Sequence, residues 1–389
     1  MSRNLHVVQI SPFADPQGRD PEELLEAWPT LVEVAGAAAA DGVSVTVVQA
    51  GSREASFERN GASIRFVSAS RPGPLRRRLG LWAHPVPSTV VRTVGRLEPD
   101  LLHTHSLSFP RFFTRVRERL PHTPILVQDH GDGIPGARIR WLHRRAYRTG
   151  VDAVAFTARE QAEPWIEAGI LPRELPVHEV LESSSRFRPG DREAARDRTG
   201  LRGDPGLLWV GRLNADKDPL TVLAAVEGVA RALPGVRLWC CFTEAPLRER
   251  VEDRIGRSPL LRDRVHLLGR VSHGRVELLL RAADFLVSGS RREGSGYAVL
   301  ESMACGTAPL ITDIPPHRRI TDGGRFGGLY PPGDPGALEE LLQDRCNRDQ
   351  ERTRGEVRRH FETRLSFRAV GSELRDAYRE VAASGSEER

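Results

Sequence analysis

Two acidic residues, Glu293 and Glu301, lie on either side of the seven-residue sequence GSGYAVL. Glu293 follows an apolar run that predicts a buried strand, and the glycines after it let the backbone turn sharply into a helix. Backbone amides and the positive dipole end at a helix start favour an anion such as a phosphate. Glu301 falls about one turn inside the helix, where a carboxylate needs a polar partner such as a ribose hydroxyl. The alternative is a plain strand-to-helix turn with Glu301 half exposed.

A second polar segment, WVGRLNADKDPL at residues 209–220, leaves another predicted strand through Gly211. Arg212 and Lys217 are then expected at the carboxyl edge of the same parallel sheet as Glu293. Two cations there suit a diphosphate, because guanidinium can form two parallel hydrogen bonds and ammonium is a compact charge. Lys217 is the only lysine among 57 basic residues, which indicates a need for the smaller group. A lone lysine on a solvated loop is the alternative.

The strands that must position these segments follow from the hydrophobic pattern. In the first half, apolar runs predict strands at residues 5–10, 43–50, 63–68, 100–105, 124–130, 152–157 and 177–182. In the second half the predicted strands are 206–211, 236–242, 265–269, 284–290, 308–312 and 327–331, with helices near 218–232, 244–255, 273–282, 297–305 and 334–345. Nearly continuous apolar runs are typical of parallel strands covered on both faces. The sequence therefore predicts an α/β protein with two doubly wound, Rossmann-like domains facing each other across a cleft.

The domain boundaries follow from this pattern and from local composition. At 389 residues the chain is longer than one hydrophobic core usually supports. We expect a first Rossmann-like domain at 1–185 and a linker at 186–205, where glycine, proline and charged residues concentrate. A second Rossmann-like domain is expected at 206–347, followed by C-terminal helices at 348–389 that could return to the first domain.

Composition and charge exclude several classes of function. The net charge of +5 comes from interspersed acidic and basic residues without a basic tail or an aromatic–basic module, so no nucleic-acid partner is expected. No apolar run approaches the roughly 18 residues of a membrane span, and the start of the sequence lacks a secretory pattern, which together predict a cytoplasmic protein. The four cysteines show no C-x-x-C spacing, and no cluster has metal-ligand spacing, so no metal site is predicted.

The two polar segments together resemble a known paired signature. VGRLNADKDPL followed by REGSGYAVLESMACGTAPLITDIP is similar to the signature of the retaining glycosyltransferases of family 4, also called glycosyl transferases group 1. The resemblance is strong over about 206–340 and covers the first half in outline. It implies the GT-B fold, with the first domain on the acceptor side, and a hexosyltransferase that retains anomeric configuration. The implied donor is a nucleotide diphosphate sugar and the implied acceptor a hydroxyl group of a saccharide, a lipid-linked molecule or a small molecule. No obligatory cofactor or divalent ion is implied.

The resemblance also implies roles for individual residues. Arg212 and Lys217 would bind the diphosphate, while Glu293 would hold hydroxyls of the donor sugar. His130, at the end of a predicted strand, matches histidines that approach the donor sugar in this family. The predicted catalytic residues are therefore Arg212, Lys217, Glu293 and His130. The predicted donor-binding residues are Gly211, Gly294, Ser295, Gly296, Tyr297 and Glu301, with Glu301 on the ribose.

Histidines of the first half also have simpler explanations. His130 could be only a hydrogen-bonded residue at a strand end. His103 and His105 of LLHTHS would either face the acceptor or serve in packing. Two segments depart from the family pattern: SPFADPQGRDP supplies only Gly18 where the family usually has a glycine pair, and ESSSRFRP stands in place of the common Asn-Gly turn. Both departures concern the acceptor side.

One further stretch, PLRRRLGLW at residues 74–82, combines Arg76, Arg77 and Arg78 with Trp82. It could dock on an anionic membrane surface that carries a lipid acceptor, or it could be a solvated loop. Two other functions stay open at this level: a catalytically silent nucleotide-sugar-binding or scaffold protein, and another nucleotide-sugar enzyme such as an epimerase. Dinucleotide oxidoreduction is disfavoured, because neither candidate first strand is followed by G-x-G-x-x-G.

Overall fold

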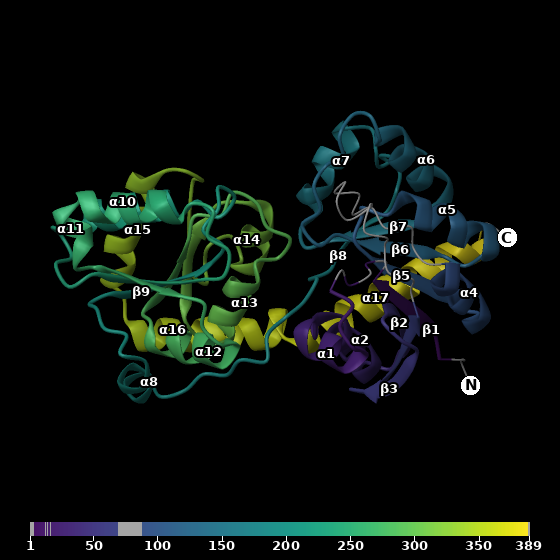
Figure 1. Cartoon of the computed structure of the whole chain (residues 1–389), viewed down its shortest axis with the longest axis horizontal. Helices are drawn as coiled ribbons and strands as arrows, with labels where there is room; N and C mark the ends of the chain where they lie inside the picture. The colour runs from purple at the N-terminus through teal and green to yellow at the C-terminus, as the bar shows by residue number, and fades with distance from the viewer. Residues whose placement is uncertain (1–3, 12, 14, 16, 69–87, 388–389) are drawn as a thin grey trace. The chain divides into compact units, whose positions relative to one another are not determined.

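The chain folds into two compact α/β units. The first unit combines Met1–Ser183 with Phe367–Arg389, and the second unit is Ser184–Ser366. The computed structural model describes residues 4–11, 13, 15, 17–68 and 88–387. Figure 1 shows the helices and strands of both units and labels most of them. Each unit is built around a sheet that is mostly parallel, as the nearly continuous apolar runs predict.

The first unit contains an eight-stranded sheet in the order β3-β4-β2-β1-β5-β6-β7-β8. The strands are β1 (His6–Ser11), β2 (Ser44–Gly51), β3 (Ala55–Arg59), β4 (Ala62–Ser68), β5 (Leu101–His105), β6 (Ile125–Gln128), β7 (Ala153–Phe156) and β8 (Val177–Glu179). All neighbours pair in parallel except β3 and β4, which are antiparallel. The sequence pattern missed β3, because this edge strand is largely exposed and has no apolar run.

Helices cover this sheet on both faces. They are α1 (Pro21–Ala27), α2 (Thr30–Ala40), α4 (Ser88–Leu97), α5 (Pro110–Arg119), α6 (Arg140–Gly150), α7 (Glu163–Glu167) and α17 (Phe367–Glu387), with a 3-10 turn η1 at Arg159–Ala162. Helix α17 packs beside α2 and contacts β5 and β6. It brings the end of the chain back onto the first sheet.

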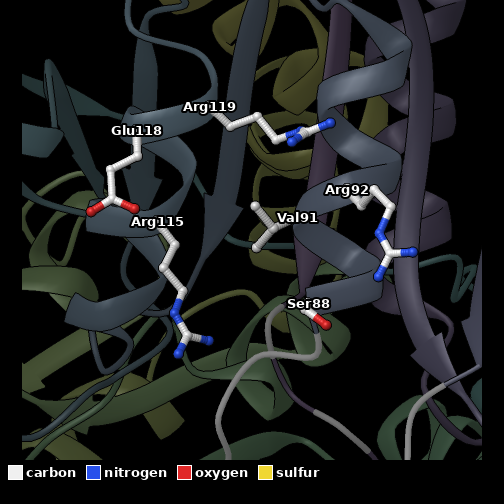
Figure 2. A pocket seen from close by; sticks show the side chains of 6 residues that line it. All are labelled: Ser88, Val91, Arg92, Arg115, Glu118 and Arg119. Carbon is white, nitrogen blue, oxygen red and sulfur yellow. The ribbon is translucent and has the colours of Figure 1, made fainter.

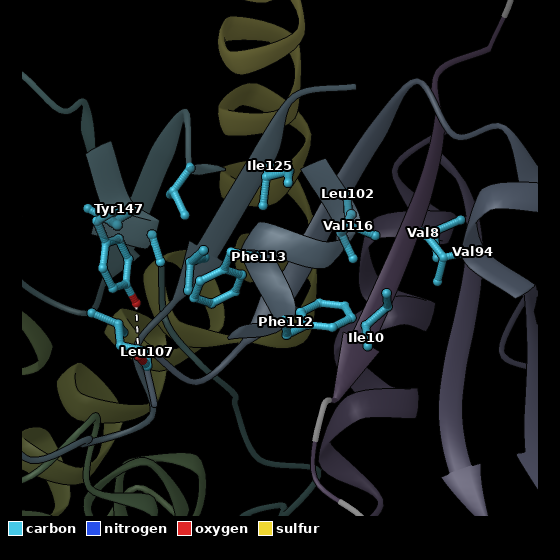
Figure 3. Packing of buried hydrophobic residues seen from close by; sticks show 14 of the residues in the cluster. Val8, Ile10, Val94, Leu102, Leu107, Phe112, Phe113, Val116, Ile125 and Tyr147 are labelled. Carbon is cyan, nitrogen blue, oxygen red and sulfur yellow. Dashed lines mark hydrogen bonds between the residues drawn. The ribbon is translucent and has the colours of Figure 1, made fainter. Parts of the chain in front are cut away.

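The hydrophobic core between the sheet and α4, α5 and α6 fixes the positions of the strand ends (Figure 3). Phe112 and Phe113 of α5 are almost fully buried there, against Ile10 of β1 and other strand residues. Burying one such aromatic side chain stabilises the fold by about 1.5–3 kcal/mol. The Tyr147 hydroxyl of α6 donates a hydrogen bond to the Leu107 carbonyl at 3.0 Å, which anchors the loop after β5.

The second unit contains a six-stranded sheet in the order β11-β10-β9-β12-β13-β14, with every neighbouring pair parallel. The strands are β9 (Gly206–Gly211), β10 (Arg237–Phe242), β11 (Val265–Gly269), β12 (Phe285–Ser288), β13 (Ala308–Thr312) and β14 (Gly328–Tyr330). Strand order reverses between β9 and β12. In doubly wound sheets, the carboxyl ends of the strands at such a reversal are where ligands bind.

The helices of the second unit are α8 (Arg192–Thr199), α9 (Pro219–Val229), α10 (Arg248–Arg257), α11 (Pro259–Arg262), α12 (His273–Ala282), α13 (Tyr297–Ala304), α14 (Pro315–Ile320), α15 (Pro335–Cys346) and α16 (Gln350–His360). A π-type turn, η2, follows at Phe361–Leu365. The segment expected as a linker, 186–205, contains α8, which packs against α12. Most of that segment therefore belongs structurally to the second sheet and its helices.

The membrane hypothesis from the sequence concerned residues that the structure does not describe. Arg76, Arg77, Arg78 and Trp82 all lie outside the described residues. Within the described ranges, none of the helices combines the length and the apolar character needed to cross a bilayer.

Candidate active site

The loops predicted to bind a phosphate-containing ligand lie side by side on the second sheet. One loop leaves β9 at Gly211 and carries Arg212 and Lys217 into α9. The other leaves β12 and carries Glu293 into α13. Because β9 and β12 are parallel neighbours, both loops emerge at the same edge of the sheet, at the reversal of strand order.

An ion pair between Lys217 and Glu293 joins the two loops. The Lys217 ammonium donates a hydrogen bond to Oε1 of Glu293, and the two side chains are 19% and 14% exposed. The Lys217 amide also donates to Oδ1 of Asn214 at 3.0 Å, which orients the loop. Partial burial strengthens such a pair relative to a surface pair, because water screens the charges less. The arrangement therefore holds one cation and one carboxylate ready at the sheet edge.

A second link between the loops involves Arg291 and Asp218. The Arg291 guanidinium donates to Oδ2 of Asp218 at 2.6 and 3.0 Å, and the Arg291 amide donates to the Asp216 carbonyl at 2.7 Å. Gly289 lies close to the backbone of the other loop, since a methyl group there would be 2.5 Å from the Asp218 carbonyl oxygen. Only glycine allows this approach without a shift of backbone, so Gly289 sets the spacing between the two loops.

The glycine-rich turn before α13 has the conformation that its sequence indicates. Gly296 is the N-cap residue of α13 and has φ of +83°, a left-handed conformation that favours glycine. As glycine it supplies no side-chain acceptor to the first-turn amides, and an anion can take that place at a helix N-terminus. Ser295, which precedes Gly296, is fully buried, while Tyr297, which follows it, is 41% exposed.

Two predicted residues have partners that the sequence did not indicate. Glu301, on α13 with its side chain 15% exposed, lies 2.6 Å from Nε2 of His273 at the start of α12. The His273 ring also packs against the Phe187 ring, with 4.5 Å between the ring centroids. Arg212 is not drawn into the Lys217–Glu293 pair: its side chain is 51% exposed, and it lies 3.9 Å from Glu244. The sequence spacing could not reveal His273, because its contact with Glu301 depends on the packing of α12 against α13.

The three predicted histidines of the first unit lie together at the carboxyl ends of β5 and β6. Nδ1 of His105 lies 2.8 Å from Nε2 of His130, and Nδ1 of His130 lies 3.0 Å from Oε2 of Glu182. His103 is fully buried, with its Nδ1 2.8 Å from the hydroxyl of Tyr378 on α17. Burial, with the nearby His130, lowers the pKa of His103 to about 3, so this ring stays neutral. Sequence reasoning singled out neither Glu182 nor Tyr378.

A buried carboxylate, Asp129, stands next to this histidine cluster. Its side-chain oxygens accept hydrogen bonds from the amides of Gly131 and Asp132, both at 3.0 Å. Burial raises the pKa of Asp129 to about 7, with a further contribution from the charge of Asp132. The folded protein therefore holds a proton on this carboxyl group over a pH range in which an exposed aspartate is ionised.

The raised pKa of Asp129 leads to a prediction about stability. The native state keeps a proton that the unfolded chain releases above pH 3.8, so this group lowers the free energy of unfolding as pH rises from 3.8 to about 7. Asp129→Asn removes that dependence, so the variant should gain on the order of 2–4 kcal/mol relative to wild type between pH 4 and pH 8. Thermal unfolding followed by circular dichroism at several pH values measures this. A difference in melting temperature that stays constant with pH would contradict it.

A separate recess lies between α4 and α5 of the first unit (Figure 2). Its volume is about 570 Å³, and it is lined by Ser88, Val91, Arg92, Arg115, Glu118 and Arg119. None of these is a predicted site residue, so the recess is distinct from the histidine cluster. In the part of the chain that the structure describes, no group of three or more histidine, cysteine, aspartate or glutamate side chains is placed to hold a metal ion.

Comparison with known proteins relates this geometry to a family. The family model described as "Glycosyl transferases group 1" matches residues 191–357, and the model described as "Glycosyltransferase Family 4" matches residues 29–177. The chain belongs to the family 4, group 1 glycosyltransferases. This confirms the resemblance predicted from the two loops, and it confirms that the protein is a transferase enzyme.

Named relatives of this glycosyltransferase transfer different sugars. It is 27% identical to an alpha-D-kanosaminyltransferase of Streptomyces kanamyceticus, over 78% of this chain and 84% of that protein. It is 25% identical to a GDP-mannose:cellobiosyl-diphosphopolyprenol alpha-mannosyltransferase of Xanthomonas oryzae pv. oryzae, over 57% of this chain and 58% of that protein. The family is therefore shared, while the sugars named for its members differ.

Solved structures of similar fold cover nearly the whole glycosyltransferase. Sucrose-phosphate synthase from Thermosynechococcus elongatus matches with a TM-score of 0.71 and 18% identity, over 98% of this chain and all of that one. Anabaena Alr3699/HepE in complex with UDP matches with a TM-score of 0.68 and 17% identity, over 97% of this chain and all of that one. These similarities confirm the predicted GT-B fold with two Rossmann-like units.

Proposed function

We propose that this enzyme transfers a sugar from a nucleotide diphosphate donor to a hydroxyl acceptor, with retention of anomeric configuration. The observation that carries the proposal is the Lys217–Glu293 pair, held between two loops at the reversal of strand order and next to the Gly296 helix start. A diphosphate needs a cation and backbone amides, and a sugar needs a carboxylate for its hydroxyls. Lys217, Glu293 and the start of α13 at Gly296 all lie at one edge of the second sheet.

Each residue of this edge has a proposed role. Lys217 and Arg212 bind the diphosphate, and the half-exposed Arg212 side chain can turn toward it. Amides at Gly294, Ser295, Gly296 and Tyr297 surround the phosphates, and the backbone at Gly211 approaches them. Glu293 holds donor-sugar hydroxyls. Glu301 exchanges its contact with His273 for the ribose hydroxyls. In the first unit, His130 is proposed to approach the donor sugar, and His103 and His105 are proposed for the acceptor side.

The chemistry follows from where charge develops. Breaking the anomeric bond leaves negative charge on the diphosphate and oxocarbenium character on the sugar. Fixed cations stabilise that charge more in the transition state than in the ground state. Retention is supported by membership of family 4. In a front-face reaction the departing phosphate oxygen takes the acceptor proton, so the mechanism requires no side-chain nucleophile.

The nucleotide and acceptor classes are supported by the relatives. The name of the Xanthomonas mannosyltransferase includes GDP-mannose and a diphosphopolyprenol, and Alr3699/HepE was crystallised with UDP. We therefore propose a nucleoside diphosphate sugar as donor, and as acceptor a saccharide, a lipid-linked molecule or a small molecule. The first domain, 1–185, is proposed to bind the acceptor, and 206–347 the donor.

A ligand screen followed by product analysis tests this function. The full chain is screened by thermal shift against UDP, GDP, ADP and their sugars, since a ligand at about 100 times its Kd stabilises by roughly 2.7 kcal/mol. One nucleotide should raise the melting temperature of wild type, and the shift should shrink in Glu301→Gln, which loses the carboxylate proposed for the ribose. Incubation of the matching sugar with acceptors, followed by NMR of the product, then reports the anomeric configuration. Stabilisation by none of the nucleotides, or an inverted product, would contradict the proposal.

A further inference from the structure

Three side chains from different strands of the first unit form one hydrogen-bonded row. His105 is the last residue of β5, His130 follows β6, and Glu182 follows β8. His130 lies between the other two, 2.8 Å from His105 and 3.0 Å from Glu182. Its side chain is 26% exposed, whereas the Glu182 side chain is 5% exposed. The partly exposed histidine thus lies against a buried carboxylate.

The hydrogen-bonding chemistry of the row restricts where protons can lie. A carboxylate only accepts hydrogen bonds, so Nδ1 of His130 must carry a proton toward Glu182. A carboxylate buried to this degree is costly unless a partner compensates its charge. An imidazolium at His130 supplies that compensation.

His105 is a suitable hydrogen-bond acceptor for the second ring nitrogen of a protonated His130. Burial, with His103 and His130 nearby, lowers the pKa of His105 well below its ordinary value, so His105 is neutral. A neutral imidazole can accept at one nitrogen, and Nδ1 of His105 is the nitrogen that faces His130. Nε2 of His130 can therefore donate to it, and an imidazolium uses both of its N–H groups within the row.

The charged groups around His130 favour the same state. Burial lowers the pKa of His130, but the hydrogen bond and charge of Glu182, with the charge of Asp132 and, once it ionises near pH 7, of Asp129, more than offset it, so the pKa is raised. His105 and His103, on the neighbouring strand β5, are both neutral. Among these named neighbours, none is a cation that would oppose protonation of His130.

We infer that Glu182 is a positioning residue that holds His130 as an imidazolium, with neutral His105 as its second hydrogen-bond partner. This inference rests on the proposed function, in which His130 serves sugar transfer. An imidazolium cannot accept a proton, so His130 acts in the reaction as a fixed positive charge and not as a general base. This agrees with a reaction in which the departing phosphate oxygen takes the acceptor proton. Glu182 opens the segment ESSSRFRP, which departs from the family pattern, so sequence comparison alone would not reveal it.

The protonation state can be measured directly in the wild-type full chain. Side-chain ¹H–¹⁵N NMR of ¹⁵N-histidine-labelled protein, with His130→Gln to assign the signal, gives the state of both ring nitrogens across pH. We expect the imidazolium pattern at pH 7, with loss of the proton only above the ordinary histidine pKa. A neutral His130 at pH 7 in wild type would overturn the inference without any variant of Glu182.

The variant Glu182→Gln tests whether the Glu182 carboxylate is what keeps His130 protonated. Without the carboxylate charge, burial dominates, so the pKa of His130 should fall below its ordinary value and the ring should be neutral at pH 7. Transfer at pH 7.5 should fall by about tenfold or more and recover partly as pH is lowered toward 6. Glu167→Gln, an exposed carboxylate on α7 of the same unit, is the matched control and should leave both readouts unchanged.

The stability of the two proteins provides an independent readout. A raised pKa on a histidine contributes stability that is present below its unfolded pKa and is lost as pH rises through the folded one. The difference in melting temperature between wild type and Glu182→Gln should therefore be largest near pH 6 and shrink at higher pH. If His130 keeps its imidazolium signal in Glu182→Gln, or the pH–rate profile is unchanged, the inference is wrong. If wild type transfers no sugar, the proposed function fails, yet the NMR titration still decides the role of Glu182.

Discussion

Replacing Lys217 with alanine is expected to lower kcat/KM for sugar transfer by about 10²–10³-fold, the largest loss from a single site. Lys217 is partly buried against Glu293, so its removal takes the Lys217 ammonium away from that carboxylate. It also removes a fixed positive charge from the place proposed for the diphosphate leaving group. Initial rates with the nucleotide sugar identified by the thermal-shift screen measure this loss.

Controls separate this effect from a general loss of charge. Arg257→Ala removes a cation from an exposed pair with Asp253, with side chains 79% and 54% exposed, and should leave kcat/KM within about twofold. Lys217→Arg should restore little, because the planar guanidinium cannot replace the compact ammonium in that space. In the double-mutant cycle with Glu293→Ala, the two losses should be strongly non-additive. Full activity of Lys217→Ala would show that the proposed donor site is wrong.

Gly289→Ala is expected to give the second largest effect, through geometry rather than charge. The added methyl group would lie 2.5 Å from the Asp218 carbonyl oxygen and 3.4 Å from the Lys217 carbonyl oxygen, so the two loops must move apart. Strain of this kind costs on the order of 1–3 kcal/mol and should lower the melting temperature by several degrees. A displacement of about 1 Å at Lys217 should reduce kcat by about 10²-fold.

Gly256→Ala is the matched control for this substitution. Gly256 is an exposed glycine of α10 in the same unit, and a methyl group there would meet no atom within 4 Å. Alanine favours a helix over glycine, so this variant should be as stable as wild type or slightly more stable, with unchanged activity. If Gly289→Ala also behaved like wild type, the spacing of the loops could not depend on this contact.

Part of the fold could be predicted because it depends on the residue types within short segments of the sequence. A strand covered on both faces must be apolar along its length, so β9 and β12 are visible as runs in the sequence. The glycine before α13 is visible because few other residues adopt a positive φ at a turn. The edge strand β3 was not predicted, because a largely exposed strand needs no apolar run.

Contacts between distant residues could not be predicted in this way. Glu301 meets His273 because α12 and α13 pack together, and His103 meets Tyr378 because the last helix returns to the first sheet. Arg212 shows the same limit, since the sequence indicates the sheet edge at which it lies but not that its side chain lies 3.9 Å from Glu244. Neighbouring position in the chain does not fix the direction of a long side chain.

The sequence by itself determined the class of the fold, the family, and the two loops whose residue types suit a phosphate-linked sugar. Each depends on the order of residue types along a short segment, where backbone geometry links spacing to shape. The tertiary structure alone decided that Lys217 pairs with Glu293 and that Glu182 stands behind His130. Those pairings depend on which strands lie side by side in a sheet, and burial of the whole core selects that arrangement.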